Sequence, residues 1–383
     1  MTKKIKRSLS QIGGPIHREG DASALVAAWA AASQEDPDTL THGFHPWPAR
    51  MHPAIARVIF QESGVRTVVD PFCGAGTTLV EARVAGVEAV GVDLSPLAVR
   101  LARVKAGFPS PESRAAFVAT AKGVAARSEA RVRGRVPIHV DLPRPELAHW
   151  HVHVLKELGG LREEIRQLER VEERRALAMV FSSILTKVGK QRSETHEEVA
   201  DRTIRKGLTT ELFLRKATEL AERWEALAEV AEGPPPDVIE GDARQLARLV
   251  GGRRFDLVLT SPPYGGTYDY AAHHARRMAW LELDDTALRR LELGARRRMG
   301  FDDAKAHWDQ EVSEMLRALR SVLRPDGGSI VLVMGDAVVA DQLVTVPDQL
   351  ERLAPDAGLQ VVGVASQPRH AGREEHIVWL RRA

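Results

Sequence analysis

Short aliphatic runs alternate with amphipathic segments in the first and last thirds of the chain. TVVD (67–70) and EAVGVDLSP (88–96) predict buried strands, and the segments 78–86 and 97–107 that follow them have helical periodicity. Further strands are predicted in DVIEG, FDLVLT, GSIVLVMG, LQVVGVAS and EHIVWLRR. A strand, a glycine turn, a helix and a second strand form a βαβ unit. The pattern predicts an α/β protein with a doubly wound, Rossmann-like parallel sheet.

The middle of the chain lacks this alternation. Residues 151–179 carry leucine and valine at helical spacing, and a further helix is predicted over 210–230. Gly233 and the three prolines of 234–236 then break the helical pattern. The sequence therefore divides into 1–108, a helical insertion over 109–235, and 236–383.

Composition narrows the class of protein. The 383 residues are 44% hydrophobic and 28% charged, which is ordinary for a globular protein. Nothing approaches the roughly 18 apolar residues of a membrane span, so no membrane association and a cytoplasmic location are expected. Cys73 is the only cysteine, which excludes an internal disulfide and a multi-cysteine zinc site. His149, His151 and His153 alternate without further ligands nearby, so no metal site is predicted.

The turn after the first predicted strand contains Gly74 and Gly76. Glycine permits a positive φ and a close approach of the backbone to a ligand. The turn lacks the lysine of a phosphate-binding loop, and Leu79 replaces the third glycine of a dinucleotide fingerprint. Asp70, at the tip of the strand, would repel a pyrophosphate but attract a cationic amino-acid group. The turn therefore favours a ligand without phosphate.

A second acidic residue, Asp93, ends the next predicted strand, where a carboxylate can accept hydrogen bonds from both ribose hydroxyls of a nucleoside. A nucleoside joined to a cationic amino acid, without phosphate, describes S-adenosylmethionine. Asp242, after the third strand, could accept a hydrogen bond from the adenine amino group. Together these residues predict S-adenosylmethionine as the cofactor.

The segment TSPPYGG (260–266) directly follows the strand FDLVL. Pro262 and Pro263 end strand pairing because proline has no backbone donor, and they fix the backbone. They would present Ser261 and Tyr264 at the carboxyl end of the strand, where open α/β sheets bind ligands. The Ser261 hydroxyl and the Pro262 carbonyl could accept hydrogen bonds from an amino group there, and the Tyr264 ring could stack on a planar ligand. These four residues are the predicted catalytic set.

DPFCGAGTT, GVDLSP and TSPPY resemble the motifs of the DNA methyltransferases that modify exocyclic amino groups, cytosine N4 or adenine N6. The resemblance covers residues 41–107 and 236–340, and places the cofactor half before the catalytic half. It implies that Tyr264 stacks on a target base removed from its duplex. HPWPARMHP (45–53) is similar to a motif that packs over the methionine part of the cofactor in that family. The resemblance adds these residues to the predicted cofactor site: His45, Pro46, Pro71, Phe72, Cys73, Thr77 and Thr78.

Within this family, a serine before Pro-Pro-Tyr is commoner among N4-cytosine enzymes, so cytosine N4 is favoured over adenine N6. The expected substrate is double-stranded DNA, with a cognate restriction or defence component as a possible partner. Two other functions stay open: RNA methylation at guanine N2, and DNA binding without catalysis. The insertion 109–235 is a candidate region for DNA recognition, particularly the basic segment 187–207. The sequence does not give the oligomeric state or the recognised site.

Overall fold

The strands of the two α/β segments pair into one eight-stranded sheet. The computed structural model describes residues 14–138, 140–190, 203–369 and 372–383. The sheet order is β1-β9-β10-β6-β5-β2-β3-β4. The strands are β1 (His17–Gly20), β2 (Thr67–Asp70), β3 (Glu88–Asp93), β4 (Asp237–Glu240), β5 (Leu257–Thr260), β6 (Ser329–Gly335), β9 (Leu359–Pro368) and β10 (Glu374–Arg382). The expected doubly wound α/β fold is confirmed.

The order in which strands are added to the sheet reverses at β2. β2, β3 and β4 follow one another outward in one direction, whereas β5 and β6 lie on the other side of β2, and all these neighbours pair in parallel. β10 pairs antiparallel with both β6 and β9, and β1 pairs antiparallel with β9. In open α/β sheets, ligands bind beyond the carboxyl ends of the strands at such a reversal. The fold therefore marks the ends of β2 and β5 as the place for a site.

Helices cover both faces of the sheet, because alternate strand residues point to opposite sides. Val68, Leu257 and Val331 pack toward one face, where a buried cluster includes side chains of the four helices listed next. These are α1 (Ser23–Gln34), α2 (Pro53–Ser63), α3 (Thr77–Val84) and α4 (Pro96–Ala106). The intervening residues Val69 and Val258 pack toward the other face. Both faces are thus apolar and covered.

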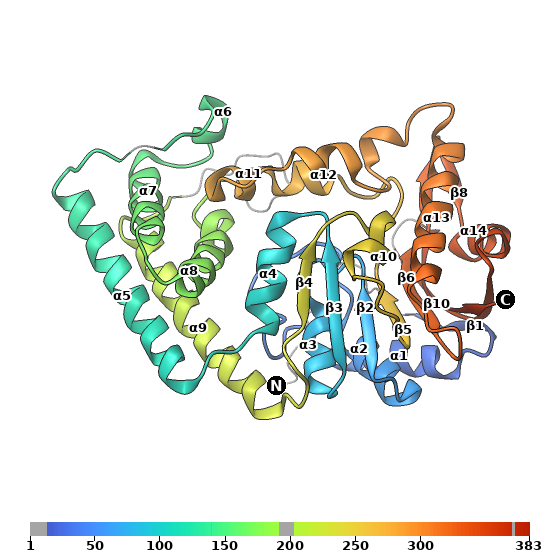
Figure 1. Cartoon of the computed structure of the whole chain (residues 1–383). Helices are drawn as coiled ribbons and strands as arrows, with labels where there is room; N and C mark the ends of the chain where they lie inside the picture. The colour runs from blue at the N-terminus through green and yellow to red at the C-terminus, as the bar shows by residue number, and fades with distance from the viewer. Residues whose placement is uncertain (1–13, 139, 191–202, 370–371) are drawn as a thin grey trace.

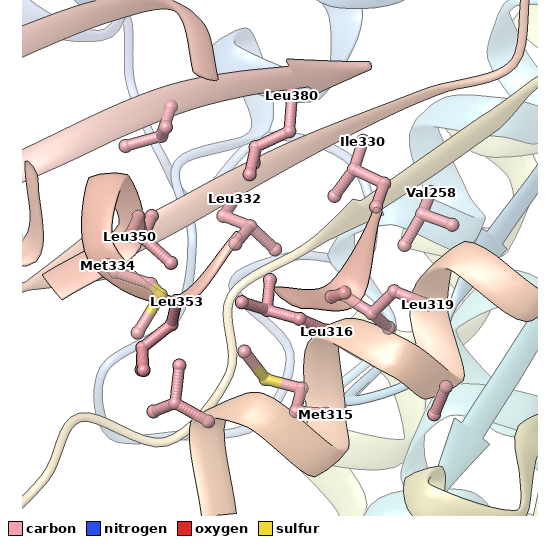
Figure 2. Close-up of a cluster of buried hydrophobic side chains, with 14 of the residues drawn as sticks. Val258, Met315, Leu316, Leu319, Ile330, Leu332, Met334, Leu350, Leu353 and Leu380 are labelled. Atoms are coloured by element: carbon pink, nitrogen blue, oxygen red, sulfur yellow. The ribbon is translucent and has the colours of Figure 1, made fainter. Parts of the chain in front are cut away.

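The second face is covered mainly by α13 (Ala304–Ser321) and α14 (Val346–Leu353), with the short α10 (Leu246–Leu249) beside them. Figure 2 shows this core: Leu316 and Leu319 of α13 lie against Ile330 and Leu332 of β6. Leu350 of α14 and Leu380 of β10 belong to the same buried cluster. This packing fixes the positions of β5 and β6, whose carboxyl ends reach the site.

The segment between α4 and β4 is helical, as its periodicity predicts. Its helices are α5 (Pro111–Arg133), α6 (Arg144–Leu147), α7 (Val152–Arg166), α8 (Val171–Ile184) and α9 (Leu208–Val230), with the 3-10 turn η1 (Leu185–Lys187). They form one side of the molecule in Figure 1 and share a buried cluster that includes Leu158, Phe181 and Phe213. Residues 191–202 of the basic segment 187–207 lie outside the described residues.

The other elements lie mostly in the last part of the chain. They are α11 (Tyr270–Leu281), α12 (Thr286–Leu291), the strands β7 (Ala337–Val339) and β8 (Gln342–Val344), and the 3-10 turns η2 (Ala243–Gln245), η3 (Arg296–Arg298) and η4 (Pro355–Ala357). α11 and α12 cross above the ends of the central strands and reach toward the helical insertion (Figure 1). Within the described ranges, no helix is both long and apolar enough to cross a membrane.

Candidate active site

A cavity lies at the reversal of the sheet, beyond the ends of β2, β3 and β5. It is lined by Asp70 from the end of β2, Asp93 from the end of β3 and Ser261 after β5. Trp47 from the N-terminal segment and Tyr270 from α11 also line it. We call this space the switch-point cavity. The cofactor motif and the TSPPY segment, 190 residues apart in sequence, thus meet around one space.

A direct hydrogen bond joins the two motifs. The Thr260 hydroxyl donates to the Asp70 carboxylate at 2.6 Å, and the backbone amide of Phe72 donates to the same oxygen at 3.2 Å. Asp70 is 3% exposed, and burial raises its pKa from 3.8 to about 6 although these bonds act in the opposite direction. A buried carboxylate with so few donors is a strong attractant for a cation.

The glycine turn is held against β3 by Asp93. One Asp93 carboxylate oxygen accepts the Gly74 amide at 2.8 Å, and the other accepts the Ser95 amide at 2.8 Å. Gly74 has a φ of +48°, and a Cβ there would lie 3.1 Å from the indole nitrogen of Trp47. The absence of a side chain therefore lets Trp47 close over the turn. Burial also raises the pKa of Asp93 to about 6.

The DPFCGAGTT residues divide between the cavity and the support behind it. Pro71, Phe72, Cys73, Gly74 and Thr77 line the cavity. Gly76 and Thr78 do not line it: Gly76 has a φ of +84° and a Cβ there would lie 3.0 Å from Ala102, and Thr78 is fully buried. Burial raises the pKa of the Cys73 thiol well above its ordinary value, so this cysteine stays protonated.

The N-terminal segment contributes different residues from those the resemblance implies. Trp47, Arg50 and Met51 line the cavity, whereas His45 and Pro46 do not. His45 is buried, and its Nε2 lies 3.0 Å from the Ser182 hydroxyl of α8 and 3.3 Å from the Arg277 guanidinium of α11. His45 therefore ties this segment to the helical insertion and to α11. A direct contact of His45 and Pro46 with the cofactor stays a prediction.

Asp242 lines the cavity beyond β4, as its position predicts. Its carboxylate also pairs with the Arg244 guanidinium through two nitrogens, at 3.0 and 2.7 Å. The carboxylate retains acceptor capacity for one more donor, but its charge is already compensated. A hydrogen bond from adenine to Asp242 stays a prediction.

The four TSPPY residues also divide between the cavity and the core. Ser261 and Pro263 line the cavity, whereas Pro262 and Tyr264 do not. The Tyr264 side chain is 5% exposed, and its hydroxyl donates to Glu375 of β10 at 2.6 Å. The Arg369 guanidinium lies over its ring, 5.0 Å from the centroid. The Tyr264 ring thus lies in the core. This position differs from the expected one, in which the ring stacks on a substrate base.

Sequence reasoning missed the residues that α11 and α12 bring over the cavity. Tyr270, His274 and Leu288 line it, together with Glu292 and Leu293 of the following loop. The His274 ring stacks on Trp47 with centroids 4.4 Å apart, which joins α11 to the N-terminal segment. An available signal was the aromatic spacing in TYDY, after the two glycines of TSPPYGG. Aromatic side chains on this side are suited to contact a planar heterocycle.

Comparison with known proteins gives partial matches. A model of the RMKL-like methyltransferase domain matches residues 44–130. Type II methyltransferase M.MvaI of Kocuria varians is 24% identical over 276 residues, 66% of this chain and 61% of that protein. Type II methyltransferase M.BsoBI of Geobacillus stearothermophilus is 23% identical over 257 residues, 59% of this chain and 49% of that protein. The chain thus covers less than two thirds of either relative.

A shorter match involves an RNA enzyme. The tRNA (guanine(10)-N2)-dimethyltransferase of Methanothermobacter thermautotrophicus is 43% identical over 51 residues, which are 12% of this chain and 15% of that protein. All of these matches support a methyltransferase domain that uses S-adenosylmethionine. They do not distinguish DNA from RNA as the substrate.

The residues of the switch-point cavity fit this cofactor. Asp70 offers a buried negative charge to a cationic amino-acid group, and Asp93 offers carboxylate oxygens to ribose hydroxyls. The glycine turn leaves room for close backbone approach, and Phe72, Leu94 and Leu293 give the cavity apolar walls. None of the described residues that line the cavity is a lysine, so this lining does not offer the P-loop cation that pairs with a phosphate chain.

Cofactor binding is expected to weaken as the pH falls through 6. The pKa of Asp70 in the folded protein is about 6, so its carboxyl is neutral below that pH and negative above it. If only the ionised form binds the cation, affinity for S-adenosylmethionine falls about ten-fold between pH 7 and pH 5 for this ionisation. Isothermal titration calorimetry at several pH values would measure the trend.

Asp70→Asn should bind more weakly at pH 7 and retain only the pH dependence that Asp93 contributes, since the pKa of Asp93 is also about 6. Asp237→Ala removes an exposed carboxylate on the neighbouring β4, paired with Arg253, and should keep the full dependence. An unchanged pH profile in Asp70→Asn would remove Asp70 from the cofactor site.

Proposed function

We propose that this protein transfers a methyl group from S-adenosylmethionine to the exocyclic amino group of a flipped base in DNA, with cytosine N4 as the favoured acceptor atom. The observation that carries the proposal is the position of Ser261. This residue lines the cavity that Asp70 and Asp93 also line, and the preceding Thr260 is hydrogen-bonded to Asp70. A neutral acceptor thus stands beside the predicted cofactor site.

When bound, S-adenosylmethionine would supply an electrophilic methyl group: the C–S bond to the sulfonium breaks as the N–C bond forms, the thioether is the leaving group, and the methylated amino group loses one proton to solvent. The amino group of an aromatic base is a poor nucleophile, because its lone pair is delocalised into the ring. An acceptor that hydrogen-bonds its N–H protons favours the pyramidal nitrogen of the transition state. Ser261 Oγ and the carbonyl of the following Pro262 are the proposed acceptors, although of these two residues only Ser261 lines the cavity. Pro262 and Pro263 hold them in place before the substrate arrives, so little reorganisation is needed.

The proposed DNA substrate is supported first by the type II relatives, and secondly by arginines beside the cavity. The arginines in segments 127–135 and 289–298 are partly neutralised: Glu164 binds both Arg127 and Arg131, and Asp269 and Glu292 bind Arg297. A different set lines two adjoining cavities between α4, α7, α8 and the end of α11. It consists of Arg100, Arg103, Arg162, Arg166, Arg170, Arg174 and Arg175.

Three members of this set form no ion pair among the described residues, although the Glu240 carboxylate on the wall of the larger cavity partly offsets the charge of Arg100. Arg103 and Arg174 donate to backbone carbonyls, and no carboxylate of the described residues lies within ion-pair distance of Arg100, Arg103 or Arg174. Arg100 follows Ser95, which lines the switch-point cavity, by five residues of α4, a rise of about 7.5 Å. The larger cavity has a volume of about 920 Å³. The arginines of these two cavities would neutralise the phosphates that flank a flipped base.

Replacing both Arg100 and Arg174 with alanine is expected to weaken binding of duplex DNA at low salt. Each lost phosphate contact should reduce the slope of log K against log salt by about 0.9, so the double variant should lose nearly 2. Fluorescence anisotropy over a range of salt concentrations would measure this. Arg253→Ala, in the loop before β5 and paired with Asp237 at the amino end of β4, should leave the slope unchanged. An unchanged slope in the double variant would remove these cavities from the DNA-binding surface.

Methylation of RNA at guanine N2 is the second candidate, and the match to the tRNA dimethyltransferase favours it. Sequencing that detects modified bases, on DNA from cells expressing the protein, separates the two. N4-methylcytosine at a defined site is the expected result, and an unmodified genome with methylated RNA would support the alternative. A restriction or defence component encoded with the protein is a further expected partner, which co-purification would test.

A further inference from the structure

The core position of Tyr264 places a buried carboxylate behind Ser261. The Tyr264 hydroxyl lies 3.4 Å from Ser261 Oγ and 2.6 Å from the Glu375 carboxylate. Ser261 lines the switch-point cavity, and Glu375 is 3% exposed within β10. The three side chains therefore form a row from the cavity into the sheet, although Glu375 is 111 residues from Tyr264 in sequence.

In this row each hydroxyl donates its hydrogen bond in the same direction, from Ser261 to Tyr264 and from Tyr264 to Glu375. Tyr264 has a single hydroxyl proton, and its short bond to Glu375 uses it. Burial raises the pKa of Tyr264 well above 10, so the phenol keeps that proton at neutral pH. The Tyr264 oxygen can then only accept from Ser261, whose own proton points away from the cavity. At 3.4 Å this contact is at the long limit of a hydrogen bond, so it orients the hydroxyl more than it stabilises it.

We propose that Glu375 is a positioning residue for methyl transfer, which acts through Tyr264 to turn the lone pairs of Ser261 toward the substrate amino group. This rests on the proposed function, because it assigns no role unless Ser261 accepts a hydrogen bond from the substrate. It gives Tyr264 a role that differs from stacking on the base. The step involves only hydrogen-bond direction, and no proton is transferred.

Neighbouring residues of β6 and β9–β10 pack around Tyr264 and Glu375 and hold them in place. Glu375 is paired in the sheet with Gly335 at the end of β6. A Cβ at position 335 would lie 2.9 Å from the Tyr264 ring and 2.6 Å from the Arg369 guanidinium, so glycine leaves the space that both occupy. Burial raises the pKa of Glu375, whereas the bond from Tyr264 and the charge of Arg369, which covers the ring, act in the opposite direction. In either protonation state the Glu375 carboxyl has an oxygen that can accept the Tyr264 proton.

Steady-state methylation and cofactor calorimetry on the full-length protein test the proposal. Tyr264→Phe and Glu375→Ala should each lower kcat about ten-fold, because the Ser261 proton is then free to point into the cavity. Affinity for S-adenosylmethionine should stay within about two-fold. Glu375→Gln keeps an oxygen that can accept from Tyr264, and should recover most of the rate. Glu374→Ala, a neighbour on the opposite face of β10, is the matched control and should behave as the wild type.

A double-mutant cycle separates positioning from general support of the fold. In a Tyr264→Phe background, Glu375→Ala should have no further effect on kcat, since its only route to Ser261 is gone. Full additivity of the two substitutions would overturn the proposal, as would wild-type kcat in both single variants. If Ser261→Ala itself left the rate unchanged, the proposed function would fail instead, so the two failures are distinguishable.

Discussion

Replacing Ser261 with alanine is expected to lower kcat for methyl transfer by about 10²- to 10³-fold, the usual effect of removing one preorganised hydrogen-bonding group from a transition state. The substitution removes the hydroxyl that faces the switch-point cavity but leaves both neighbouring prolines in place. Among the hydrogen bonds of the described residues, none joins the Ser261 side chain to Asp70 or Asp93, on which cofactor binding is proposed to depend, so the cofactor Kd should be unchanged. Single-turnover transfer of a labelled methyl group, with calorimetry in parallel, measures both quantities.

Ser321→Ala provides the matched control for this loss. Its hydroxyl donates to the Ala318 carbonyl of its own helix, at the end of α13. Its rate should equal that of the wild type. Wild-type kcat in Ser261→Ala would show that the amino group finds its acceptor elsewhere in the cavity, and the catalytic assignment would be lost.

Asp93→Ala is expected to have the largest effect on cofactor binding. Two hydrogen bonds from ribose hydroxyls to a carboxylate contribute about 1.5–3 kcal/mol each. Their loss should raise the Kd for S-adenosylmethionine at least about 100-fold. The same carboxylate also accepts the Gly74 and Ser95 amides, so its removal loosens the glycine turn and adds to the effect.

Thermal unfolding shows whether this variant is folded, and calorimetry gives its affinity. Asp237→Ala, an exposed carboxylate at the start of the adjacent β4, should retain wild-type affinity. A folded Asp93→Ala protein with wild-type affinity would exclude the ribose assignment. It would also leave Asp70 as the remaining carboxylate at the cofactor turn.

The residues at strand ends could be placed from sequence, because neighbouring parallel strands bring their carboxyl ends to one edge. Asp70, Asp93 and Ser261 each directly follow or end a buried apolar run. Recognising those runs as parallel strands was enough to bring the three residues together around the switch-point cavity. The glycine turn was equally predictable, since Gly74 and Gly76 directly follow a predicted strand; the structure adds that a Cβ at Gly74 would lie 3.1 Å from the Trp47 indole nitrogen.

The orientation of Tyr264 could not be placed in this way. Its ring turns into the core because Glu375 accepts its hydroxyl and Gly335 leaves it space, and both residues lie more than 70 positions further along the chain. The positions of Tyr270 and His274 on the wall of the cavity likewise depend on how α11 crosses the sheet. That crossing is set by the packing of α11 against α8 and the N-terminal segment. Strand β1 was missed because HREG is short and exposed on both faces.

Transfer of label from methyl-labelled S-adenosylmethionine to nucleic acid tests the central claim most directly. The purified protein is given duplex DNA of mixed sequence and total RNA in the same reaction, and the products are digested to nucleosides and separated. We predict label in DNA as N4-methylcytosine, dependent on Ser261 and Asp93. Label confined to RNA, or absent from both polymers while the cofactor is bound, would contradict the account.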